Sequence, residues 1–135
     1  MLFRSDLSAD AGRAAVIDAA DAWMATLGAP LDWLVNAAGM IVLKPIGEVS
    51  GDDLRRAFDV NVGSAFILTQ RLGERMRDGG AVVSFSSPSA KFVATTEAAA
   101  YALTKAAISQ VTRSDRKSTR LNSSHSQQSR MPSSA

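Results

Sequence analysis

Tyr101 and Lys105 have the residue types and the spacing that could do chemistry. They stand four positions apart in an alanine-rich stretch, 98–111, that is predicted to be helical, so both side chains should lie on one face of that helix. A cation beside a phenol favours the phenolate. A tyrosine in that setting can act as general acid or base when an alcohol and a ketone are interconverted. Taken alone, the pair is also consistent with two exposed side chains on an ordinary helix.

The segment Ser84-Phe-Ser-Ser87 places hydroxyl groups at the end of a strand predicted over 81–87. The apolar residues of this stretch indicate a strand buried in a parallel sheet. Open α/β sheets bind ligands at the carboxyl edge of their strands, so these hydroxyls are candidates for contacting a substrate. The alternative is that the serines only form a turn.

Two further features are candidates for functional positions. Asn36-Ala-Ala-Gly39 follows a strand predicted over 31–35, and its small residues would let a ligand approach the backbone closely; a tight structural turn is the alternative. Asn61 falls inside a predicted helix, where asparagine is unfavourable. A polar residue in an otherwise apolar pattern indicates a functional exception, although a solvent-facing asparagine would look the same.

Strands and helices are expected to alternate along the chain and so to position these residues. Ser50 with Asp53 resembles a capping box, and the helix that follows should end at Gly79-Gly80. This alternation predicts an α/β fold, a doubly wound parallel sheet with helices on both faces. The expected order is the end of a short strand at 2–3, a helix over 14–27, a strand over 31–35, the long helix, a strand over 81–87 and a helix over 98–111.

The basic charge of the chain lies in its last 21 residues. The whole chain carries a net charge of +2, whereas residues 115–135 alone carry +3. Seven of those 21 residues are serine and no helical or strand period is visible, so the segment is predicted to be a disordered tail. Without it the charge gives no reason to expect a nucleic-acid partner.

Residues 115–125 and 129–135 resemble the translation of one frame of a common sequencing adapter. We therefore expect a partial domain over 1–114 and an adapter-derived tail over 115–135, with a natural basic arm as the alternative. The chain has no cysteine, and its one histidine, His125, lies in this tail, so no metal site is expected. No apolar run is long enough to span a membrane, and we expect a cytoplasmic protein without a membrane partner.

Together these motifs resemble the short-chain dehydrogenase/reductase family, over nearly all of residues 2–113. The resemblance implies a Rossmann-like sheet, NAD or NADP as cofactor, and a small alcohol or carbonyl compound as substrate. It further implies a homodimer or homotetramer. The residues it implies as catalytic are Asn61, Ser87, Tyr101 and Lys105, and those it implies as cofactor-binding are Asp6, Leu7, Asn36, Ala37, Ala38, Gly39, Tyr101 and Lys105.

The sequence departs from the family pattern in several respects, among them a stretch from Asp6 to Asn36 that is a few residues longer than usual. Fourteen positions separate Ser87 from Tyr101, one more than is common in the family, and Ser89 is the alternative catalytic serine. Nothing like the family's glycine-rich phosphate loop precedes Asp6, so we expect the middle of a longer protein that is inactive as it stands. The alternatives are an epimerase-type relative and a binding module with a basic tail.

Overall fold

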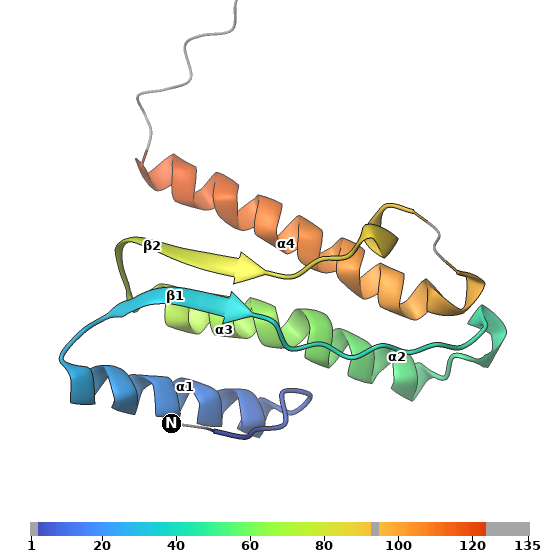
Figure 1. Cartoon of the computed structure of the whole chain (residues 1–135), viewed down its shortest axis with the longest axis horizontal. Coiled ribbons are helices and arrows are strands. Elements are labelled where there is room, and N and C mark those ends of the chain that lie inside the picture. Colours follow the sequence, from blue (N-terminus) through green and yellow to red (C-terminus); the bar gives the residue numbers. More distant parts are fainter. Residues whose placement is uncertain (1–2, 93–94, 124–135) are drawn as a thin grey trace, which may run out of the picture.

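The computed structural model describes residues 3–92 and 95–123, in which helices and parallel strands alternate (Figure 1). A π-helical turn, η2 (Asp59–Gly63), joins two of the helices into one path, and short 3₁₀ turns stand at η1 (Ile46–Glu48), η3 (Pro88–Ala90) and η4 (Thr96–Ala98). The helices and strands are α1 (Asp10–Leu27), β1 (Leu31–Asn36), α2 (Gly51–Phe58), α3 (Ser64–Gly73), β2 (Met76–Ser84) and α4 (Ala99–Ser123).

Strands β1 and β2 pair in parallel, with Asn36 opposite Ser84 at their carboxyl ends. The pairing shifts register early in β1, where β2 contains extra residues around Gly79. Gly79 has a φ of 81°, a conformation that glycine adopts without steric cost. The prediction that Gly79-Gly80 ends the helix is therefore wrong. The helix ends at Gly73, because the chain from Met76 onward pairs with β1 and forms a strand instead.

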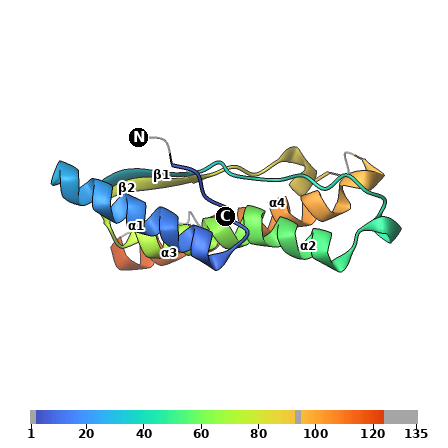
Figure 2. The same cartoon turned by 90° about the horizontal axis from the view of Figure 1, so that it is seen from below.

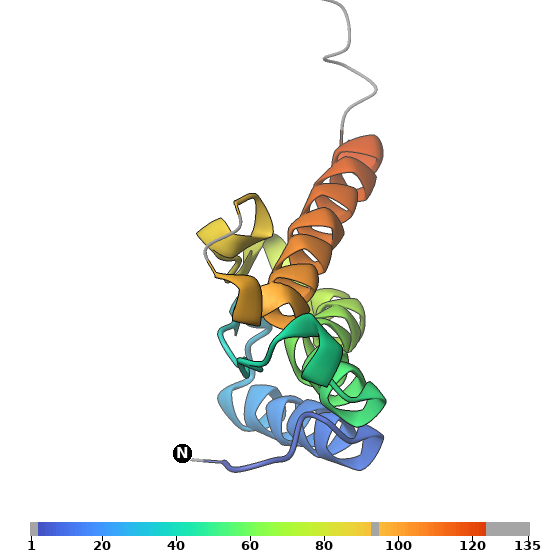
Figure 3. The ribbon, with the colours of Figure 1, turned by 90° about the vertical axis from the view of Figure 1, so that its right-hand side faces the viewer.

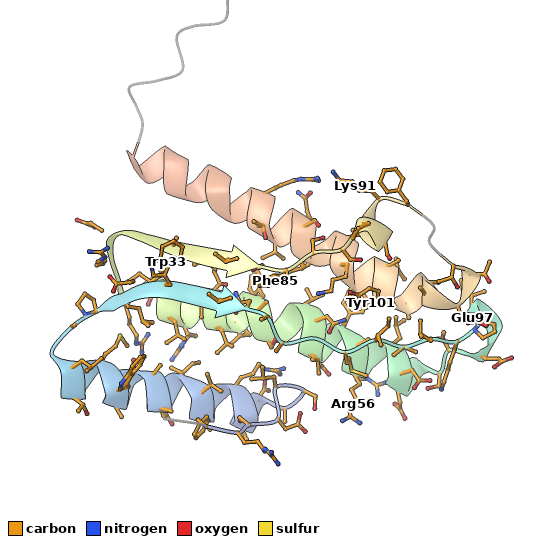
Figure 4. All side chains as sticks on the ribbon, in the orientation of Figure 1. Trp33, Arg56, Phe85, Lys91, Glu97 and Tyr101 are labelled. Carbon is orange, nitrogen blue, oxygen red and sulfur yellow. The ribbon has the colours of Figure 1, made fainter. Side chains whose placement is uncertain are left out.

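Helices α1, α3 and α4 lie on one side of the two strands (Figure 2). Figure 3 shows α4 and α1 at opposite ends, with the α2–α3 path between them. The parallel α/β class is confirmed, but within the described residues helices cover only one face of the sheet. Phe3 belongs to no strand, and Leu2 lies outside the described residues. The other face exposes Trp33 and Val35 of β1 and the side chain of Phe85 after β2 (Figure 4).

Two apolar clusters hold the helices in place. The first joins α1 and α3 to β1, and the second lies where α2, α4 and the loop after β1 meet. Burial of such apolar side chains is the main contribution that stabilises a small fold. The first cluster centres on Ile17, Leu68 and Leu72, and the second on Val42, Ala57 and Ala100.

Helix α4 continues to Ser123, nine residues past the boundary expected at Ser114. The helix includes residues 115–123 of the predicted tail, and the rest of that tail lies outside the described residues. The reason is local, because residues 115–121 contain neither glycine nor proline and include arginine, lysine and leucine, which favour helices. A helix that already has its first turns formed can extend through such residues. None of the helices within the described ranges has the length and apolar character needed to cross a bilayer.

Candidate active site

A π-helical turn places Asn61 in the interior. In η2 the backbone N–H of Ser64 bonds to the carbonyl oxygen of Asp59, five residues back instead of four. The Ser64 hydroxyl then donates to the carbonyl oxygen of Val60, at 2.6 Å. Such turns insert one extra residue into a helix and often mark functional positions. Here the insertion leaves Asn61 only 3% exposed, facing α4 and the loop after β1.

The Asn61 amide clamps the loop that follows β1. Its Oδ1 accepts a hydrogen bond of 2.7 Å from the backbone N–H of Met40, and its Nδ2 donates to the Met40 carbonyl oxygen at 2.8 Å. The second Nδ2 hydrogen goes to Thr104 Oγ1, at 2.9 Å. Both donors are thus used, which a buried amide requires to offset its desolvation. The asparagine side chain therefore fixes three segments: the loop, the π-turn and α4.

Helix α4 presents Tyr101 beyond the carboxyl ends of the strands (Figure 4), and Lys105 follows it four residues later in the same helix. Lys105 is 7% exposed, and its Nζ donates to the carbonyl oxygen of Phe85 at 2.8 Å. The same Nζ lies 5.7 Å from the centroid of the Tyr101 ring. Tyr101 is half-buried, and no residue within the described part of the chain hydrogen-bonds to its hydroxyl. The phenol is thus free to meet a substrate while the ammonium beside it is held rigidly.

Gly39 lies beside the Asn61 amide and the Lys105 ammonium and has no side chain to fill the space next to them. A Cβ atom built on Gly39 would lie 3.4 Å from Asn61 Oδ1 and 3.7 Å from Lys105 Nζ. Ala37 and Ala38 are exposed, and the Ala37 N–H bonds back to the Val35 carbonyl oxygen in a tight turn. The structure therefore brings the turn after β1 against Asn61 and Lys105.

Ser84 ends β2, Ser86 and Ser87 lie just beyond it, and the three hydroxyls have different partners. Ser84 Oγ accepts a hydrogen bond from Asn36 Nδ2, at 3.4 Å, across the two strands. Ser86 Oγ donates to the Lys105 carbonyl oxygen at 3.1 Å and is therefore occupied by α4. Ser87 Oγ accepts from the N–H of Ser89 at 3.2 Å. This contact leaves the O–H hydrogen of Ser87 available to donate to a ligand.

Asp6 and Leu7 lie apart from this cluster, in the turn before α1. Asp6 is exposed, and its carboxylate accepts hydrogen bonds from the Ser8 hydroxyl and the Ser8 N–H, which lower the pKa of Asp6 below its ordinary value. An open cleft of about 370 Å³ separates this turn from α2. It is lined by Asp6, Ser8, Asp52, Arg55, Arg56 and Asp59.

Sequence reasoning missed Thr104, whose hydroxyl joins Asn61 to the tyrosine helix. Thr104 is fully buried, accepts from Asn61 and donates to the Tyr101 carbonyl oxygen at 2.7 Å. The signal was present, because Ala100, Thr104 and Ile108 recur every four residues on the buried face of α4. A hydroxyl in that apolar stripe predicts a buried hydrogen-bond partner.

Comparison with known proteins identifies the family. The model of a family described as "Enoyl-(Acyl carrier protein) reductase" matches residues 2–116. The structure is similar to a short-chain dehydrogenase/reductase from Serratia marcescens, with a TM-score of 0.78 and 33% identity over 86% of this chain and 46% of that one. The chain belongs to the short-chain dehydrogenase/reductase family. A short-chain dehydrogenase from Burkholderia cenocepacia in complex with NADP is also similar, with a TM-score of 0.77 and 28% identity over 86% of this chain and 46% of that one.

Curated proteins are also similar to this short-chain dehydrogenase/reductase. The hydroxynaphthalene reductase-like protein Arp2 of Metarhizium brunneum is 38% identical over 84 residues, which are 62% of the chain. A cyclopentanol dehydrogenase of Comamonas testosteroni is 40% identical over 80 residues, which are 58% of the chain. In both comparisons the matched part is 32% of the relative's length. The chain thus spans about a third of the curated relatives that it matches.

Proposed function

We propose that the protein containing this chain is an NAD(P)-dependent oxidoreductase that interconverts an alcohol and a ketone. The observation that carries the proposal is the position of the Lys105 ammonium, which is buried, anchored on the Phe85 carbonyl oxygen and 5.7 Å from the Tyr101 ring. The relatives named above as a reductase and a dehydrogenase, and the neighbour solved with NADP, support the same chemistry.

The residues present fit a nicotinamide cofactor. Because Gly39 has no side chain to stand against Asn61 and Lys105, a flat group could approach the backbone next to Lys105. An ammonium has three N–H donors, and the Phe85 carbonyl oxygen takes one, so Lys105 retains donors for cofactor hydroxyls. Asn36 to Gly39 would line the same cofactor, and Asp6 with Leu7 would contact its far end. When bound, NAD or NADP supplies the hydride.

Tyr101 exchanges a proton with the substrate oxygen in this mechanism. Its hydroxyl is the acid for reduction of a ketone and, as phenolate, the base for oxidation of an alcohol. The Lys105 ammonium, held beside the Tyr101 ring by its bond to Phe85, would attract negative charge that develops during the proton transfer. Ser87 would donate its free O–H to the reacting oxygen and so stabilise the charge that develops there.

Asn61 would hold a water of the proton relay that ends at Lys105. Its side-chain donors are both committed to Met40 and Thr104, so an oxygen of Asn61 would hold that water as a hydrogen-bond acceptor. The amide itself acts as the clamp that keeps the turn after β1, the π-turn and α4 in register.

We call the product of the natural reading frame that contains residues 1–114 of this sequence the parent protein. The proposal is tested by incubating the parent protein with NADH or NADPH and a panel of small ketones. We expect ketone-dependent oxidation of one nicotinamide and the reverse reaction with the matching alcohol. Conversion of a sugar nucleotide without net nicotinamide turnover would instead support an epimerase and refute the proposal.

A further inference from the structure

Arg13 is a buried cation in the first turns of α1. It is 8% exposed, and its guanidinium lies beneath the Asp6–Leu7 turn. Nη2 donates to Asp10 Oδ1 at 2.6 Å, and Nη1 donates to the Leu7 carbonyl oxygen at 2.8 Å. Nη1 also approaches the carbonyl oxygen of Asp59, at 3.5 Å. Arg13 therefore connects the start of α1 and the turn before it to the π-turn, 46 residues further along the chain.

An ordinary ion pair does not explain why a cation is buried here. The Asp10 side chain is 97% exposed, and pairs with one partner in water contribute little. Arg13 also stands four residues before the buried Ile17, on the face of α1 that packs against α3, where an apolar side chain would avoid the cost of desolvating a charge. The feature that a hydrophobic residue could not reproduce is donation to two backbone carbonyls at once.

The two carbonyls belong to different parts of the candidate site. Leu7 lies in the turn proposed to contact the far end of the cofactor. The Asp59 carbonyl oxygen is the acceptor that defines the π-turn, because it receives the Ser64 N–H. Gly63 of the same turn also lies close, since a Cβ built there would be 3.8 Å from Arg13 Nη1. The guanidinium therefore bridges the Asp6–Leu7 turn to the π-turn that carries Asn61.

We propose that Arg13 is a positioning residue that couples the Asp6–Leu7 turn to Asn61. It acts through the Asp59 carbonyl oxygen on the register of the π-turn, and through Asn61 on the loop after β1. The inference rests on the proposed function only for its effect on catalysis. The structural coupling itself can be measured without any activity.

The first test is residue-resolved amide hydrogen exchange on the parent protein. The Met40 N–H donates to Asn61 Oδ1, so its protection reports the position of Asn61. Arg13→Met should lower Met40 protection about tenfold relative to the Ile108 amide in the α4 core, a local opening rather than global unfolding. Arg55→Met is the matched control, because Arg55 is an exposed arginine of α2, and should leave the ratio unchanged. An unchanged ratio in Arg13→Met would refute the coupling.

The second test is kinetic and uses Arg13→Lys as a conservative variant that keeps the charge but not the planar fork. We expect Arg13→Met to lower kcat about tenfold and to weaken NAD(P)H binding, with less effect on the KM of the ketone, and Lys to restore part of the loss. If Met prevents folding, a Lys variant with wild-type exchange and kinetics refutes the inference. If the wild-type parent protein neither binds nor oxidises NAD(P)H, the proposed function fails while the exchange ratio still decides the coupling.

Discussion

Asn61 Nδ2 donates a hydrogen bond of 2.9 Å to Thr104 Oγ1, 43 residues further along the chain. The bond joins the π-turn to the helix that carries Tyr101 and Lys105. Thr104 in turn donates to the Tyr101 carbonyl oxygen. One buried hydroxyl therefore connects the Asn61 side chain, which holds the loop after β1, to the backbone of the candidate catalytic tyrosine. The proposed chemistry depends on this connection for its geometry.

Thr104→Val tests that connection, since valine has nearly the same shape but no hydroxyl. It leaves Asn61 Nδ2 buried with one donor unpaired, which should cost about 1–3 kcal/mol in the free energy of unfolding. Thr104→Ser should retain most of the stability. Thr112→Val is the control, because among the described residues the Thr112 hydroxyl bonds only back to the Ile108 carbonyl oxygen. Equal losses for Val at 104 and 112 in urea unfolding would contradict the account.

Gly39→Ala tests the space beside Lys105. The added Cβ makes contacts of 3.4 Å and 3.7 Å, so the fold should survive, but the methyl group occupies the space proposed for the cofactor. We expect the Kd for NAD(P)H to rise about tenfold, as overpacking of a fitted site does. Gly51→Ala is the control, because nothing lies within 4 Å of a Cβ there. Fluorescence titration measures both.

Ser87→Ala and Ser89→Ala distinguish between the two candidates for the catalytic serine. The Ser87 oxygen accepts from the Ser89 N–H, so the Ser87 O–H hydrogen can still donate to a ligand. Removing this hydroxyl should lower kcat about 10²–10³-fold, as loss of a donor to a developing oxyanion does. Ser89→Ala should retain most of the activity, because its backbone N–H remains. The opposite ranking in steady-state assays would assign the role to Ser89.

Asp53 gives the molecule an acid-dependent stability. Hydrogen bonds from Lys44 and Ser50 lower the pKa of Asp53 from 3.8 to about 2. A carboxyl with a lower pKa in the folded state stabilises the fold above its ordinary pKa, and this contribution is lost as the pH falls from about 4 to about 2. Asp53→Asn or Lys44→Met should therefore flatten the decline of the unfolding midpoint in this window. Lys91→Met, which removes an exposed lysine, should leave the decline unchanged.

The candidate site was largely predictable because its residues are local exceptions. Asn61 is a poor helix residue inside an apolar pattern, and Tyr101 with Lys105 has helical spacing. Their convergence at the carboxyl edge of β1 and β2 follows from the parallel sheet. The π-turn was not predictable, because one inserted residue in Asp59–Gly63 leaves no distinct composition in the sequence.

Tertiary context decided the features that the sequence did not predict. Met76 looks helical by its neighbours but pairs with Leu31 in the sheet, which ends α3 at Gly73. Arg13 looks like a surface charge on α1, and only the packing of the Asp6–Leu7 turn and the π-turn around it makes it buried. Periodicity along one segment cannot report contacts with a segment 46 residues away.

The most direct test of the proposed function is Tyr101→Phe in the parent protein, with turnover and NAD(P)H binding measured on the same preparation. Removing one hydroxyl should lower kcat by about 10²–10⁴-fold, the usual contribution of a general acid or base, while the Kd for NAD(P)H changes less than about twofold because Lys105 and Gly39 are untouched. Such a result would support Tyr101 as the proton donor and acceptor. Unchanged turnover in the phenylalanine variant would remove Tyr101 from the mechanism and contradict the account.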